Sequence, residues 1–166
     1  MNPEKEPAFD HTGSSFDSFL DEEGIRNEVE ATAIDRVTAW QLSESARRKG
    51  RLQIEIAEMQ RAFCKQQAAE YVAALGETKS GFAPSTKGLV TVNGLRHPTT
   101  DETTGWYIWC GEVLSDAPDF FAPLHTYHLY EEFPEIARLL GLSPGFRFLL
   151  AGDYLDVWYD ASLLIV

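Results

Sequence analysis

The sequence predicts an α+β fold, in which a helical N-terminal arm precedes a small mixed or antiparallel sheet with one or two packed helices. Apolar residues recur at helical spacing through most of residues 14–76, which predicts a helical segment there. Beyond residue 88 the period changes to the short aromatic and β-branched runs typical of strands. Gly, Ser, Thr and Pro collect between these two parts, and this composition predicts a linker over residues 77–87.

The N-terminal part contains three helical patterns. Residues 1–13 are polar and are expected to form a disordered tail. A short helix is expected over residues 16–23, and longer apolar stripes follow over residues 25–49 and 52–75. The sequence leaves open whether the two longer patterns form a hairpin or one long kinked helix about Gly50.

The C-terminal part, residues 88–166, is expected to be one α+β domain. A turn at Gly152-Asp153 is expected to join its last two strands as a hairpin. The expected elements are strands over residues 89–92, 106–110, 146–150 and 155–159, and helical structure over residues 124–140 with Pro134 starting a second helix.

The chain is strongly acidic, with a formal net charge of −12. Residues 101–166 contain eleven Asp and Glu residues and only two arginines, Arg138 and Arg147. Affinity for nucleic acid comes largely from Lys and Arg neutralising phosphates, so this composition argues against nucleic acid as a partner. A basic protein partner is favoured instead, because opposite charge raises the rate of encounter.

Neither cysteine is in a pattern typical of a disulfide framework or a zinc site. Cys64 and Cys110 are single and far apart, and no cofactor motif is present. The N-terminus has no apolar signal region, and no stretch approaches 18 apolar residues. The expected location is therefore the cytoplasm, with no membrane involvement.

Aromatic residues interleave with carboxylates in the C-terminal part, which indicates a face for binding a protein partner. Trp106 and Trp109 have an odd offset on one strand, so one is expected in the core and the other more exposed; burial of both remains the alternative. Asp156 and Asp160 are expected to share one strand face. The candidate interface residues are Trp106, Trp109, Glu112, Asp116, Asp119, Phe120, Asp156, Trp158 and Asp160.

Three other patterns are weaker candidates for a site. His125 and His128 lie three residues apart and, with Asp119, Glu131 or Glu132, would make a His/His/carboxylate metal set. Asp153 with Asp156 and Asp160 would make an acid/base or magnesium cluster, although a solvated strand face explains these residues equally well. A basic run at Arg47, Arg48, Lys49 and Arg51 would suit a nucleic-acid contact or simply a helix end. No catalytic motif is present, so no catalytic residues are expected.

One block of the C-terminal part resembles a known family. The residues that carry the resemblance include Gly105-Trp106-Tyr107-Ile108-Trp109, Asp119-Phe120-Phe121, Pro144-Gly145-Phe146-Arg147-Phe148 and Asp156-Val157-Trp158-Tyr159-Asp160. In this order they resemble the immunity protein 33 family, small bacterial domains found near polymorphic toxin genes. The resemblance implies a non-enzymatic α+β domain that neutralises a cognate protein toxin. The acidic, aromatic face would suit a toxin with a basic surface, for example a nuclease.

The N-terminal segment shows a second resemblance. Residues 13–25, and the run on to Trp40-Gln41-Leu42, look like the leader of helix-turn-helix antitoxins. No helix-turn-helix pattern follows Leu42. The resemblance implies an alternative function as an antitoxin-like transcriptional regulator, or a helical arm that forms a homodimer. The sequence does not fix the oligomeric state or identify the toxin.

Overall fold

The computed structural model describes residues 16–165 and confirms the α+β class. Residues up to Arg48 and residues from Lys49 onward form two units, and each is described by itself. The disordered tail expected over residues 1–13 lies outside the described residues.

The first helix, α1, spans Phe16–Glu22, close to the expected position, and Gly24 terminates it. Gly24 adopts a left-handed conformation with a φ of 69°. Its N–H donates to the Asp21 carbonyl, and the Ile25 N–H donates to the Leu20 carbonyl, each at 3.1 Å. These two bonds form a Schellman cap, which satisfies the last carbonyls of α1 and turns the chain into the next helix.

The second helix, α2, spans Arg26–Gln66 without interruption. The hairpin is therefore excluded, and Gly50 lies inside the helix. A single glycine costs only about 1 kcal/mol relative to alanine, and Gly50 lacks the left-handed φ that a helix end would need. The helix instead ends where Ala68 adopts a φ of 50°. The helical segment expected over residues 14–76 is thus too long at its C-terminal end.

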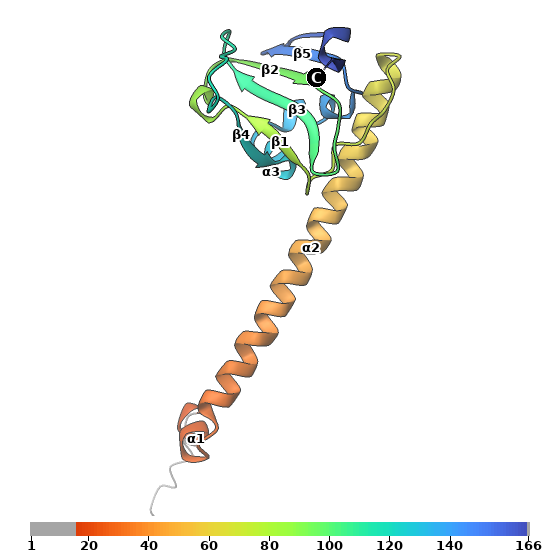
Figure 1. Ribbon diagram of the computed structural model, residues 1–166. Helices are drawn as coiled ribbons and strands as arrows, with labels where there is room; N and C mark the ends of the chain where they lie inside the picture. The colour runs from red at the N-terminus through yellow and green to blue at the C-terminus, as the bar shows by residue number, and fades with distance from the viewer. Residues whose placement is uncertain (1–15, 166) are drawn as a thin grey trace, which may run out of the picture. The chain divides into compact units, whose positions relative to one another are not determined.

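Six strands form one mixed sheet in the order β4-β1-β3-β2-β5-β6, and Figure 1 shows most of them. β1 and β3 are parallel, and every other neighbouring pair is antiparallel. The strands are β1 (Lys79–Phe82), β2 (Thr91–Arg96), β3 (Thr103–Cys110), β4 (Ala122–His125), β5 (Phe146–Ala151) and β6 (Tyr154–Tyr159). The β5–β6 pairing confirms the expected hairpin.

Three expectations about the sheet domain were wrong. Residues 77–87 contain β1 and a 3-10 turn at Pro84–Thr86 rather than a linker. The strand expected over residues 89–92 starts later and runs through Arg96. Residues 122–125 form the edge strand β4, so the expected helix begins only at α3, Thr126–Glu132. Pro134 does begin a new turn, but it is a 3-10 turn at Pro134–Ile136, followed by another at Leu139–Gly141.

Tertiary pairing makes β1 a strand. Its sequence, Lys-Ser-Gly-Phe, has little intrinsic β preference. Within the sheet, however, Ser80 is buried, and its hydroxyl hydrogen-bonds those of Thr104 at 2.7 Å and Thr126 at 2.8 Å. This hydroxyl chain links β1 to β3 and to the start of α3, which a solvated linker would not do.

The sheet has a packed core on each face. On the first face, Trp106 and Phe148 pack with Ile56 and Phe63 from the C-terminal part of α2. On the second face a smaller cluster contains Ala83, Leu95, Trp109 and Leu163, with Phe120 and Phe121 packed against it. The last 3-10 turn, Ala161–Leu164, supplies Leu163 to this cluster.

A fully buried arginine joins the loops beneath the first face. No carboxylate pairs with Arg96 among the ion pairs of the described residues, and burial lowers its pKa to about 10, so it remains a cation at neutral pH. Backbone carbonyls solvate this charge instead. Its guanidinium donates to the carbonyls of Thr104 (2.9 Å), Val72 (2.8 Å), Leu140 (3.2 Å) and Leu142.

Candidate functional site

The two strand tryptophans lie on opposite faces of β3, and both are buried. Trp106 is completely inaccessible, and its indole N–H donates to the Leu140 carbonyl at 2.8 Å. Trp109 is 5% exposed and lies in the second-face cluster. The expectation of one exposed tryptophan was therefore wrong, and the alternative of two buried ones holds. The reason is that the β3–β4 loop returns over the second face and covers Trp109.

Phe120 and Phe121 are the side chains that provide this cover. Phe121 packs edge-on against Tyr107 with ring centroids 5.0 Å apart, and it is 6.3 Å from Trp109. Phe120 packs on Phe121 at 4.8 Å. Both phenylalanines are partly buried, so Phe120 serves the fold rather than standing free as an interface anchor.

The even spacing along β6 places Asp156 and Trp158 on the second face, and Asp160, one residue beyond the strand, bonds with Arg147 of the same face. Their cross-strand neighbours on β5 show this register: Asp156 lies opposite Leu149, and Trp158 lies opposite Arg147. Asp156 is exposed, and Trp158 is 39% exposed. These two side chains are available to a partner.

Asp160 is held within the protein. Its carboxylate accepts hydrogen bonds from the Ser162 N–H at 3.1 Å and from Arg147 at 3.0 Å, and it also accepts one from the Ser162 hydroxyl. Hydrogen bonds from Ser162 first, and then from Arg147, hold the pKa of this carboxyl below its usual value. Arg147 also lies over the Trp158 ring at 5.6 Å. Asp160 therefore acts as a cap for the last 3-10 turn and as the partner of Arg147.

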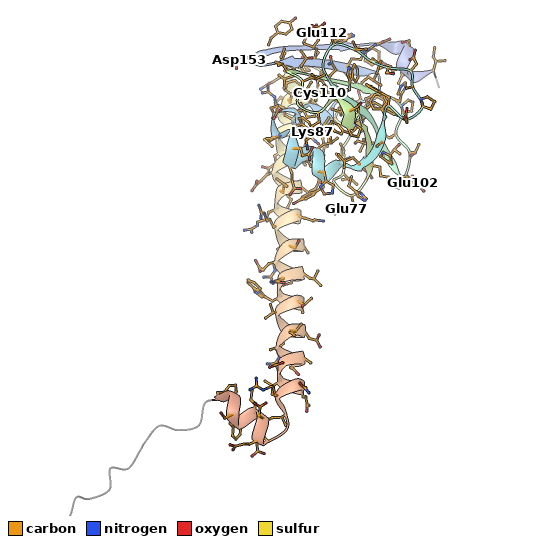
Figure 2. All side chains as sticks on the ribbon, turned by 90° about the vertical axis from the view of Figure 1, so that its left-hand side faces the viewer. Glu77, Lys87, Glu102, Cys110, Glu112 and Asp153 are labelled. Atoms are coloured by element: carbon orange, nitrogen blue, oxygen red, sulfur yellow. The ribbon has the colours of Figure 1, made fainter. Side chains whose placement is uncertain are left out.

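The remaining carboxylates of the candidate interface are solvent-exposed. Glu112, Asp116 and Asp119 belong to the β3–β4 loop, and Asp153 is in the β5–β6 turn. None of these four takes part in an ion pair of the described residues. Figure 2 shows Glu112 and Asp153 at the same end of the sheet domain. The exposed side chains of the candidate interface are thus mostly acidic, with less exposed aromatic surface than expected.

Two open hollows, which no sequence pattern indicates, lie beside Tyr107 on the second face. One, of about 200 Å³, extends toward Lys79, Phe121 and Pro123, and the other, of about 560 Å³, extends toward His97 and Leu164. Tyr107 is 37% exposed between them. The His97 Nδ1 lies 2.9 Å from the Leu163 carbonyl, and no Asp or Glu among the described residues lines either hollow beside it.

Comparison with protein families decides the identity of the sheet domain. The model of the Imm33-like domain matches residues 59–160, which is more than half of the chain. The chain belongs to the Imm33-like family. No curated protein and no solved structure matches it.

The Imm33-like match extends the domain further toward the N-terminus than residue 88. It begins in α2, one turn before the buried Phe63 and Cys64, and it includes β1. The C-terminal part of α2 therefore belongs with the sheet that it packs against. Residues 13–42, on which the resemblance to antitoxin leaders rests, lie outside the matched residues.

The weak metal candidates do not form a metal site in the Imm33-like domain. The His125 ring contacts the Glu77 carbonyl at 3.0 Å, and His128 lies 3.6 Å from Glu131. Among residues 16–165 no three His, Cys, Asp or Glu side chains gather as metal ligands do. The His/His/carboxylate set therefore does not assemble.

The basic run lies within a single helix, α2. Arg47 pairs with Glu44 at 3.0 Å, and Lys49 lies 3.8 Å from Glu77. Because residues 26–66 form one helix, they contain no turn of a helix-turn-helix. Within the described residues, no helix combines the length and the apolar character that a membrane span needs.

Sequence reasoning missed several polar residues that shape the Imm33-like domain. Arg96 is one, and Gln60 is another: its amide donates to the Ala137 carbonyl at 3.0 Å from a fully buried position on α2. Tyr130, also buried, donates its hydroxyl to the Ala74 carbonyl. A polar residue in a helical or strand pattern resembles a surface residue, so only its tertiary partners identify it as buried.

Proposed function

We propose that this protein is an immunity protein that binds a cognate toxin and neutralises it by covering the toxin's active surface. Membership of the Imm33-like family carries the proposal, because an immunity domain in general implies a toxin as its partner. Neutralisation by occlusion needs a complementary surface and no catalytic residue. The expected place of action is the cytoplasm.

The charge of residues 101–166 supports a basic toxin. These residues contain eleven carboxylates and only two arginines, and both arginines already have internal partners. Arg147 pairs with Asp160, and Arg138 lies 5.4 Å from the Phe63 ring. A nuclease, whose substrate groove must be positive to hold phosphates, fits such a surface.

The exposed part of the candidate face is the region proposed to meet the toxin. It comprises Glu112, Asp116, Asp119, Asp156 and Trp158. Trp106 and Trp109 are excluded because they are buried, and Asp160 is excluded because its carboxylate is occupied by Arg147 and Ser162. The carboxylates would mainly raise the association rate and fix the orientation of the complex.

The test begins with capture of partners by the tagged full-length chain from its host's lysate, at low and at moderate salt. Each captured protein is then expressed alone and together with the chain. We expect one that stops growth alone and is harmless with the chain present. If the chain relieves the toxicity of no captured protein, the proposal is rejected.

A charge-reversal series tests the acidic face itself. The triple variant Glu112→Lys, Asp116→Lys, Asp119→Lys should protect less well and associate more slowly, with weaker dependence of the rate on salt. Glu58→Lys, an exposed position on α2, is the control for charge reversal away from this face. Equal protection by the triple variant and the control would place the contact elsewhere.

A second observation favours self-association through the helical arm. Within residues 26–40 of α2, the exposed side chains of Val29, Val37 and Trp40 share one face with Ala33. In an antiparallel pair centred on Ala33, the two valines would meet each other, and Trp40 would meet Arg26 of the second copy. Light scattering should therefore show a dimer for the full chain, and Trp40→Asp should shift it to monomer. A monomeric wild-type chain at high micromolar concentration would refute the homodimer.

A further inference from the structure

Five exposed apolar side chains cluster at one end of the sheet, where β2 and β6 begin and β3 ends. We call this cluster the end patch. Single exposed apolar residues are common on protein surfaces, but a contiguous group marks an interaction site. Its members and their exposed fractions are Leu89 (56%), Val90 (86%), Val113 (74%), Leu114 (41%) and Tyr154 (62%).

Backbone pairing brings the three segments of the end patch together. The Gly111 N–H donates to the Thr91 carbonyl at 2.7 Å, which joins the loop after β3 to the start of β2. Thr91 is paired with Ala151 on β5, and Ala151 is paired with Tyr154 on β6. Residues 88–90, 111–114 and 152–154 therefore lie at the same end of the sheet.

The segment that carries Leu89 packs directly on Gly111. A Cβ built on Gly111 would lie only 2.5 Å from the Leu89 Cδ1 atom, and Gly111 has a φ of 81°. Only glycine combines this backbone conformation with so close an approach. The Asn93 amide also donates to the Gly111 carbonyl at 2.7 Å. These contacts hold the base of the end patch in one arrangement.

Thr86 fixes the other side of the same segment. The Thr86 hydroxyl donates to the Ala83 carbonyl at 2.7 Å and accepts from the Cys110 N–H at 2.8 Å. The backbone carbonyl of Thr86 accepts from the Leu89 N–H. Thr86 is buried, so this junction is shielded from water. A preorganised patch loses less conformational entropy on binding than a flexible loop would.

The end patch is bordered by negative charge. The segments 88–95, 111–122 and 148–157 contain five carboxylates and no Lys or Arg. All five are exposed: Glu112, Asp116, Asp119, Asp153 and Asp156. An apolar centre with a charged border is the usual anatomy of a protein interface, in which the centre supplies affinity and the border supplies orientation.

We propose that the end patch is the toxin-binding site, and that the toxin presents an apolar contact surrounded by Lys and Arg side chains. The inference rests on the proposed immunity function and specifies where and how binding occurs. Charge complementarity selects this occupant, because five exposed carboxylates that make no ion pair among the described residues would repel an acidic partner.

Photo-crosslinking in the living host tests the location and captures the toxin in the same step. A photoreactive phenylalanine analogue is placed at Val90 or Val113 in the end patch, and at Ile54 on α2 as a control that is 63% exposed. We expect one protein crosslinked at the two patch positions and not at Ile54, and the same protein to be toxic when expressed alone.

Binding measurements with that crosslinked protein complete the test. The variant Val90→Ser, Val113→Ser should raise Kd by roughly 10-fold to 100-fold, as truncation of central interface residues does, while Ile54→Ser changes it less than twofold. Because these side chains are exposed, circular dichroism should show unchanged folding. If the wild-type chain protects but the patch variants bind and protect equally well, the end patch is not the toxin-binding site. If the wild-type chain protects against no toxin, the immunity function itself fails.

Discussion

Replacing Arg96 with methionine should destabilise the sheet domain strongly although no ion pair is lost. Methionine has a similar length but no donor. The carbonyls of Val72, Thr104 and Leu142 would lose their hydrogen bonds from the guanidinium, whereas the Leu140 carbonyl keeps its bond from Trp106. A buried acceptor without a donor costs about 1–3 kcal/mol, so three of them cost roughly 3–9 kcal/mol.

Removal of the buried charge offsets part of this loss. Lowering the pKa of an arginine to about 10 corresponds to a cost of about 3 kcal/mol for burying the charge. The free energy of unfolding should therefore fall by about 0–6 kcal/mol, with a central value of about 3 kcal/mol, which is a large part of the roughly 5–15 kcal/mol typical of a domain. Arg96→Lys keeps the charge but has one nitrogen, which cannot reach all of these carbonyls, so it should also destabilise.

Urea unfolding followed by tryptophan fluorescence measures this effect, since Trp106 and Trp109 are buried in the folded domain. Arg51→Met is the matched control, because Arg51 is exposed and its replacement should change the free energy of unfolding by less than about 0.5 kcal/mol. If Arg96→Met is as stable as Arg51→Met, the carbonyls do not depend on the guanidinium and the reasoning is wrong.

Local geometry leads to three further predictions. Gly50→Ala should stabilise the chain by roughly 0.5–1 kcal/mol, because Gly50 is helical with open space around it, whereas Gly24→Ala should destabilise it because of its φ of 69°; thermal unfolding compares the two. The pKa of Asp160 is lowered on folding, so its contribution to stability is present above the ordinary Asp pKa and is lost as pH falls through the lowered value. Asp160→Asn should therefore unfold with a shallower dependence on pH below about 4 than the wild-type chain; identical slopes would contradict this. Burial raises the pKa of the Cys64 and Cys110 thiols, so a thiol reagent at neutral pH should label them only as fast as the domain opens.

Some of the candidate site was readable from the sequence because it depends on local geometry. Side chains alternate along a strand, so the spacing of Asp156, Trp158 and Asp160 was enough to place them on one face. Which of these groups remain available depends on residues outside β6. Arg147 and Ser162 occupy Asp160, and the loop that carries Phe120 and Phe121 covers Trp109.

The sequence by itself determined the α+β class, the helical N-terminal part, the β5–β6 hairpin and the acidic charge of the domain. These features follow from composition and from periods that are set within a few residues. Only the tertiary structure decided that Gly50 lies inside a helix and that Lys79–Phe82 is a strand. It also placed Leu89, Val113 and Tyr154 at one end of the sheet, through hydrogen bonds between residues that are far apart in the chain. Such pairings leave no periodic signal, because their energy comes from partners that local sequence does not contain.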